Sequence, residues 1–181
     1  MSRVWFTPFL LLISFACQEQ NIALVNEIKT LDARWIRVSG QLTDLGKVIP
    51  KWTIQMEDSK SILQEMGFSS VQIRDSIVNE QTQMVIQIKK VSGEFEKTKI
   101  QFEDKINAFN LWQHNALKIS GENPDQIKEE LRQFQEEFEK IRVELEDLRI
   151  RLYALAQNHN DLRISLLEEN EWVQYDPISI R

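Results

Sequence analysis

The feature that most constrains the fold is a seven-residue repeat of apolar side chains in two long segments of the chain. In the first segment, apolar residues recur in alternating steps of four and three, with one serine among them. The positions are Leu24, Ile28, Leu31, Trp35, Val38, Leu42, Leu45, Ile49, Trp52, Met56, Ser59, Leu63 and Met66. A repeat of this period keeps one helix face against a partner only when the helices supercoil with a left hand. The pattern therefore predicts a long coiled-coil helix.

A second copy of the same spacing lies in the C-terminal third of the chain. Its positions are Ile127, Leu131, Phe134, Phe138, Ile141, Leu145, Leu148, Leu152, Leu155, His159, Leu162 and Leu166. Only His159 interrupts the apolar series, and a polar residue at such a position often fixes the register of a coiled coil. A role for His159 as a ligand or a proton switch is the alternative interpretation.

The middle segment carries a less regular apolar stripe. Its members are Ile73, Ile77, Met84, Ile88, Val91, Phe95, Phe102, Ile106 and Phe109. Further apolar residues widen the stripe, namely Ile86, Ile100, Leu111, Trp112 and Ile119. A helix that touches two neighbours at once needs a wide apolar face. We therefore expect this segment to pack against both of the others.

The two junctions carry helix stop and start signals. Gly67 follows the first repeat, and a capping box from Ser69 to Gln72 can start the next helix. Gly121 can end that helix, Asn123 is a good N-cap, and Pro124 suits the first helical position because the N–H it lacks would be unpaired there. Connections this short make successive helices run antiparallel and side by side.

The predicted fold is all-α, an elongated antiparallel three-helix bundle or coiled coil over residues 24–173. The expected helices cover about 21–66, 69–119 and 124–173, and a C-terminal tail covers 174–181. Pro50 lies inside the first helix and removes a hydrogen bond, so a kink or a short break is expected there.

The N-terminus carries a different pattern. Arg3 precedes an apolar run from Val4 to Phe15, which is too short to span a bilayer comfortably, and Ala16 then stands before Cys17. This segment resembles a bacterial lipoprotein signal. The resemblance implies a signal peptide over 1–16, a fatty acid such as palmitate on Cys17, and a short tether over 17–23.

The resemblance covers this segment alone, and two other interpretations stay open. Ala16 and Cys17 fit the usual lipobox, whereas Ser14 and Phe15 depart from its commonest pattern. The segment could instead be an ordinary secretory peptide or an uncleaved anchor. Because Gln18 is not Asp, similarity to the sorting rule of enteric bacteria implies the outer membrane, on its periplasmic or surface face.

Composition excludes several kinds of site. Cys17 is the only cysteine, so neither an intramolecular disulfide nor a cysteine-based metal site can form. The formal charge of −6 becomes −7 when Arg3 is removed with the signal segment, which argues against nucleic acid as a partner. No glycine-rich phosphate loop, nucleophile elbow or metal-ligand cluster occurs, so no catalytic residue, cofactor or metal is expected.

Two groups of aromatic and apolar residues have more than one interpretation. Trp35 and Trp52 at core spacing are core residues by default, or they could line a pocket for an apolar ligand. The tail is unusually apolar for a chain end and either folds back on the bundle or contacts a partner. The residues proposed for such a contact are Trp172, Tyr175, Ile178 and Ile180.

The preferred functional hypothesis is a non-catalytic envelope lipoprotein. Its bundle would act as a scaffold, spacer or adaptor, held to the bilayer through Cys17 and contacting an envelope protein. The alternative is a secreted or periplasmic binding module, a carrier or chaperone whose bundle opens around an apolar ligand or client. Long heptad repeats also permit dimeric or swapped arrangements, so the oligomeric state stays open.

Overall fold

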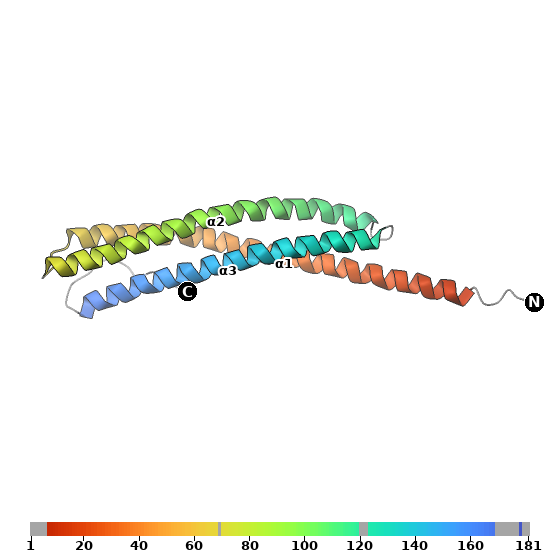
Figure 1. Cartoon of the computed structure of the whole chain (residues 1–181), viewed down its shortest axis with the longest axis horizontal. Coiled ribbons are helices and arrows are strands. Elements are labelled where there is room, and N and C mark those ends of the chain that lie inside the picture. The colour runs from red at the N-terminus through yellow and green to blue at the C-terminus, as the bar shows by residue number, and fades with distance from the viewer. Residues whose placement is uncertain (1–6, 69, 120–122, 169–177, 179–181) are drawn as a thin grey trace, which may run out of the picture. The chain divides into compact units, whose positions relative to one another are not determined.

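The predicted fold class is confirmed: the chain is an all-α three-helix bundle. The computed structural model describes residues 7–68, 70–119, 123–168 and 178, with side chains from residue 22 onward. It contains three helices and, within these residues, no strand (Figure 1). The helices are α1 (Thr7–Glu65), α2 (Val71–Ile119) and α3 (Pro124–Glu168).

The helices contribute to two compact units. Unit 1 is formed by Met1–Ser39 and Gln101–Arg142, and unit 2 by Gly40–Ile100 and Val143–Arg181. Each unit therefore contains one piece of α1, one of α2 and one of α3, and each has its own set of contacts.

The helix directions in unit 2 follow from its contacts. Moving forward along α1 from Gly46 to Met56 corresponds to moving backward along α2, from Phe95 to Gln81. The residues of α3 that pair with Glu94 and Gln81 are Arg151 and His159, respectively. In unit 2, α2 is thus antiparallel to both α1 and α3, as predicted.

In unit 1, α2 and α3 are antiparallel as well. Trp112 of α2 contacts Glu130 of α3, and Lys105, two turns earlier on α2, contacts Glu137, two turns later on α3. Trp35 places α1 against both of these helices, because its ring contacts Phe102 of α2 and Phe138 of α3.

The predicted repeats of α1 and α3 are the core. Every predicted position of α1 is buried except Met66, which is half-buried, and every one of α3 is buried except half-buried Phe134. The polar members Ser59 and His159 are as buried as their apolar neighbours, with exposures of 1% and 0%. The seven-residue period thus determines which side chains face the core, whatever their polarity.

Of the residues expected to widen the stripe of α2, Trp112 is half-buried against Phe109 and Phe134, but three others do not face the core. Ile86, Ile100 and Leu111 are all more than half exposed, so they do not widen the core face. The inward positions instead continue the same steps of three and four through buried Gln81 and Thr98. These two polar residues made the repeat look interrupted.

At the second junction the predicted N-cap of α3 is confirmed, whereas Gly121, the predicted end of α2, lies outside the described residues; the N-cap of α2 is shifted by one residue. Ile127 donates its backbone N–H to the carbonyl of Asn123, so Asn123 is the N-cap and Pro124 the first helical residue. At the start of α2, Arg74 donates to the carbonyl of Ser70, which makes Ser70 the N-cap; Ser69 lies outside the described residues. Gly67 does not adopt a left-handed backbone conformation.

Helix α1 is longer and more continuous than expected. It begins at Thr7 rather than near residue 21, and it passes through Pro50 without the predicted break. Pro50 is exposed, whereas Ile49 and Trp52 beside it are 1% and 3% exposed. Packing on this inner face outweighs the single lost backbone hydrogen bond. No described helix has a stretch that is both long and apolar enough to cross a bilayer.

Candidate functional site

The most unusual part of unit 2 is a polar layer inside its core. Gln81 of α2 and His159 of α3 are both 0% exposed. The Nε2 of Gln81 donates to the backbone carbonyl of Met56 in α1, at 2.8 Å, and its Oε1 lies 3.2 Å from Nδ1 of His159. A single side chain therefore links all three helices by hydrogen bonds.

This arrangement determines which nitrogen of His159 carries a proton. A carbonyl oxygen can only accept, so the amide nitrogen of Gln81 must be the group that faces Met56. The Oε1 of Gln81 then faces His159 and needs a donor there. The neutral imidazole is accordingly protonated on Nδ1, which donates to Gln81.

Burial keeps His159 neutral. Removal from water, together with the positive charge of nearby Arg163, lowers the pKa of His159 from 6.5 to about 4. At neutral pH the layer is an uncharged network, and His159 resembles a register-fixing core residue more than a metal ligand. Within the part of the chain that the structure describes, no three His, Cys, Asp or Glu side chains are grouped so as to hold a metal ion.

Asn160, next to the polar layer on α3, binds Ile178. The side-chain amide of Asn160 donates to the backbone carbonyl of Ile178, at 3.0 Å, and its oxygen accepts from the backbone N–H of Ile178, at 2.9 Å. The side chain of Ile178 is only 2% exposed. Both polar main-chain groups and the side chain of this residue are thus accommodated by the bundle.

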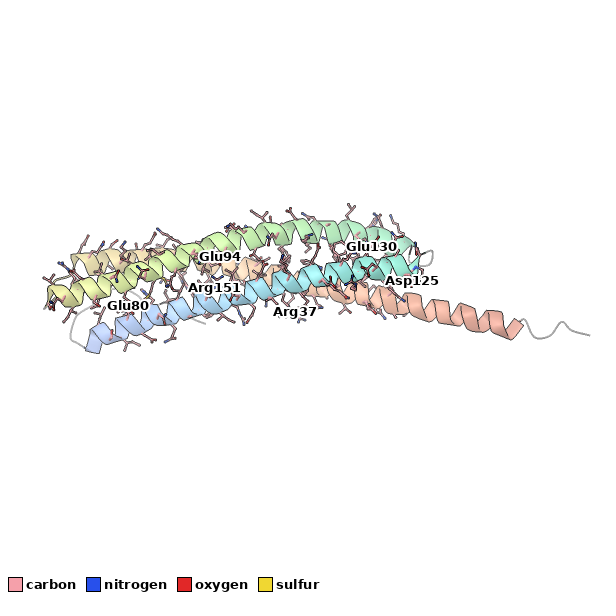
Figure 2. The ribbon with its side chains drawn as sticks, viewed as in Figure 1. Arg37, Glu80, Glu94, Asp125, Glu130 and Arg151 are labelled. Atoms are coloured by element: carbon pink, nitrogen blue, oxygen red, sulfur yellow. The ribbon has the colours of Figure 1, made fainter. Side chains whose placement is uncertain are left out.

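Ion pairs join the outer edges of α2 to its neighbours in unit 2. Arg151 of α3 pairs with Glu94 of α2, which lies beside it in Figure 2, and with Asp147 one turn back on its own helix. The hydrogen bond from Arg151 lowers the pKa of Glu94. Lys89 pairs with Glu57 of α1. These groups are partly exposed, so each pair contributes modestly to stability.

An open groove of about 370 Å³ lies between α2 and α3 beside this ion pair. Its lining includes the aliphatic side chains of Val91 and Leu155 and the charged groups of Lys90 and Arg151. Arg151 already has two acidic partners, so its charge is compensated within the protein.

Unit 1 has a core of a different kind, built on Trp35. This side chain is 0% exposed, and its ring lies 5.0 Å from Phe138, 5.3 Å from Phe102 and 6.2 Å from Phe109, measured between centroids. Offset and edge-to-face ring contacts at these distances are favourable. The guanidinium of Arg34 lies 4.5 Å from the centre of the Phe138 ring and also pairs with Glu139.

The aromatic cluster of unit 1 extends to its surface. Trp112 contacts Phe109 and Phe134, and its Nε1 donates to Glu130 at 2.6 Å; Glu130 is labelled in Figure 2. Trp112 and Phe134 line an open groove of about 360 Å³ whose polar members include Glu137, the ion-pair partner of Lys105.

The predicted site residues have different outcomes. Ile178 is buried and held by Asn160, whereas Trp172, Tyr175 and Ile180 lie outside the described residues. Cys17 lies in α1, and its side chain is likewise outside the described part.

Neither core tryptophan lines either of the two grooves described above. Trp35 is enclosed by rings, and Trp52 is 3% exposed with its ring 5.6 Å from that of Tyr153. Their core interpretation accounts for both positions.

No family model, curated protein or solved structure matches this chain.

Sequence reasoning missed two residues of this region, Gln81 and Asn160. Gln81 did carry a signal, because it stands four residues after Ile77 and three before Met84 and so continues the repeat. Asn160 had none, since its partner is 18 residues away and beyond the end of a helix.

Proposed function

We propose that this chain is a membrane-anchored lipoprotein of a bacterial cell envelope that acts as a non-catalytic scaffold, spacer or adaptor for a protein partner. The support for an anchor is the apolar run that ends at Ala16 and Cys17. The support for a scaffold is the all-α bundle, whose inward faces are occupied by packed side chains in each unit.

One observation carries the proposal furthest: Cys17 lies on the same helix as the first core residues. Leu24 and Ile28 of α1 are 1% and 0% exposed, only two and three turns after Cys17. A lipid on Cys17 would therefore tether the bundle through one of its own core helices. The acidic chain, with a formal charge of −7 once Arg3 is removed, would not itself be attracted to anionic lipid headgroups.

The proposal of an adaptor role rests on apolar side chains that are exposed on the surface of the bundle. In unit 2, the outward positions Val143, Ile150 and Ile164 of α3 are each at least half exposed. They follow the heptad spacing on the side of α3 that faces away from its core. We infer that a partner protein contacts the bundle on this side of α3. The proposed location is the outer membrane, on its periplasmic or surface face.

The alternative function, a soluble carrier or chaperone, has weaker support. It depends on a bundle that opens around Trp35 and Trp52, and both are buried in direct ring contacts. Opening unit 1 at Trp35 would separate contacts with three other rings.

The decisive experiment is metabolic labelling with a fatty acid in a bacterial host, followed by membrane fractionation. Wild type should carry label and remain with membranes, and Cys17→Ser should lose both. A matched control is the double variant Cys17→Ser, Ser76→Cys, which returns a cysteine at an exposed position of α2. It should stay unlabelled, because attachment depends on the signal and not on a thiol as such.

The opposite results would reject the anchor. An unlabelled wild type that is exported in soluble form would remove the tether and favour the carrier function. Label that returns with Ser76→Cys would show acylation unrelated to a lipoprotein signal.

A further inference from the structure

The contact between Asn160 and Ile178 has the form of a strand pairing. A side-chain amide carries the same donor and acceptor as a peptide group. By bonding to both the N–H and the C=O of Ile178, at 2.9 and 3.0 Å, Asn160 offers this residue what a neighbouring strand would offer. Both hydrogen bonds involve only main-chain groups, so any residue except proline could form them at this position.

Selectivity at this position comes from the side chain. The side chain of Ile178 is 2% exposed, whereas Asn160, which bonds to its main chain, is half-buried. Burying an isoleucine side chain contributes roughly 1.5–3 kcal/mol. The contact thus combines hydrogen bonds to the main chain with burial of an apolar side chain, and many proteins recognise extended peptides by these two features together.

Chain length does not force Ile178 into this position. Asn160 lies eight residues before the end of α3 at Glu168, a distance of roughly 12 Å along a helix. The ten residue steps from Glu168 to Ile178 can span roughly 33 Å when extended. The contact is therefore held by its own interactions, and the connection is long enough to let Ile178 leave.

We propose that Asn160 and the surface that buries the side chain of Ile178 form a binding site for a short extended peptide with a β-branched apolar residue, and that Ile178 occupies this site in the free protein. A partner protein that presents such a segment binds by displacing Ile178. This inference deepens the adaptor part of the proposed function. It does not depend on the lipid anchor.

The cis tail and a trans peptide compete for one site. A tethered segment acts at an effective concentration in the millimolar range, so wild type should bind a free peptide weakly. Removing the cis occupant should expose the site. Loss of the two hydrogen bonds to Asn160 should then weaken peptide binding by about tenfold or more.

The test is fluorescence polarisation with a labelled peptide of sequence QYDPISIR, which corresponds to residues 174–181. The full-length proteins are wild type, Ile178→Asp, and Ile178→Asp combined with either Asn160→Leu or Asn158→Leu. Asn158 is the matched control, since it is an exposed asparagine two residues before Asn160. A second peptide carries an N-methyl group on the isoleucine that corresponds to Ile178.

The expected result is binding to Ile178→Asp at least tenfold tighter than to wild type. Asn160→Leu and the N-methyl peptide should each lower that affinity about tenfold or more, whereas Asn158→Leu should not change it. Circular dichroism serves to check that each variant keeps its helices. If Ile178→Asp does not fold, Ile178→Ala takes its place.

Two results would overturn the proposal. One is a folded Ile178 variant that binds the peptide no better than wild type. The other is binding that ignores both Asn160→Leu and N-methylation. Because purified protein is used without lipid, either result would leave the labelling experiment on Cys17 unaffected, and the two failures are distinguishable.

Discussion

Units 1 and 2 are both three-helix bundles, yet their cores are held by different chemistry. In unit 1, Trp35 contacts three phenylalanine rings from the other two helices. In unit 2, the corresponding link between helices is Gln81, which bonds to a backbone carbonyl of α1 and to His159 of α3. Among the described residues, every buried polar side chain belongs to unit 2: Ser59, Gln81, Thr98 and His159.

The difference indicates which core contributes more to stability and which one fixes the register of the helices. Ring contacts bury large apolar areas and stabilise unit 1 without demanding one hydrogen-bonding geometry. A buried polar layer adds less stability, but any shift in register leaves its groups unpaired at a cost of about 1–3 kcal/mol each. We therefore expect the ring contacts of unit 1 to contribute mainly stability and the polar layer of unit 2 to define the alignment of the helices.

The largest expected effect comes from a charge placed in unit 2 away from its polar layer. Leu145→Asp buries an unpaired carboxylate at a position that is 3% exposed, and should lower the free energy of unfolding by about 5 kcal/mol. Thermal and denaturant unfolding would measure this loss. Glu144→Lys, one residue earlier and half-buried, should change it little. Equal effects of the two variants would contradict the assigned register of α3.

A slightly smaller loss is expected when the aromatic core of unit 1 is opened. Trp35→Ala removes three ring contacts and leaves a cavity, so the free energy of unfolding should fall by about 3–5 kcal/mol. The matched control is Trp112→Ala, because Trp112 is half-buried beside a surface groove. It should cost less than half as much in chemical denaturation. Similar costs for both would mean that Trp35 is not the centre of the cluster.

Unit 2 should respond to mild acid through His159. Its pKa is about 4 in the folded chain and 6.5 when exposed, so between these values the unfolded chain binds more protons. Stability therefore falls as the pH is lowered from about 6.5 towards 4, by about 3 kcal/mol in total. Urea unfolding at a series of pH values measures this slope.

The control for acid sensitivity is His159→Leu, which removes the titrating group. Its stability should be nearly flat between pH 6.5 and 4.5. Hydrogen bonds from Arg151 and Arg142 are the main causes of the lowered pKa values of Glu94 and Glu139, respectively. The stability that these two carboxylates contribute is therefore lost only below about pH 4.5. A slope in the variant equal to that of wild type would show that His159 is not the responsible group.

Much of the fold was predictable, because a heptad repeat specifies both the helix and its inner face. That is why Ser59 and His159 could be placed in the core in spite of their polarity. In α2 the buried polar residues Gln81 and Thr98 hide the repeat, so the apolar residues alone predict an irregular stripe and assign the exposed Ile86 to the core face. In α2 the seven-residue spacing predicts which side chains are buried better than their hydrophobicity does.

The candidate sites were less predictable for two physical reasons. Whether the tail folds back depends on a two-bond contact between Asn160 and Ile178 that no local pattern encodes. The link from Gln81 to Met56 uses a backbone carbonyl, which every residue possesses and which sequence cannot single out.

The smallest net effect, and the most informative about unit 2, concerns the polar layer itself. Gln81→Leu leaves the Nδ1–H of His159 without its acceptor and should cost about 1–3 kcal/mol. The double variant Gln81→Leu, His159→Leu replaces both partners by apolar groups and should be close to wild type in stability. A double-mutant cycle from urea unfolding gives the coupling energy between the two side chains.

The same double variant separates stability from alignment. If the layer only stabilised unit 2, the double variant would behave as wild type in every respect. If it fixes the register, the variant should be stable yet populate swapped or higher oligomers, because apolar heptads alone accept several pairings. Light scattering on the two proteins at matched concentration distinguishes these cases. A monodisperse variant with the wild-type mass would assign the specificity of the bundle to the ring contacts of unit 1, and would reverse the division of roles between the two cores.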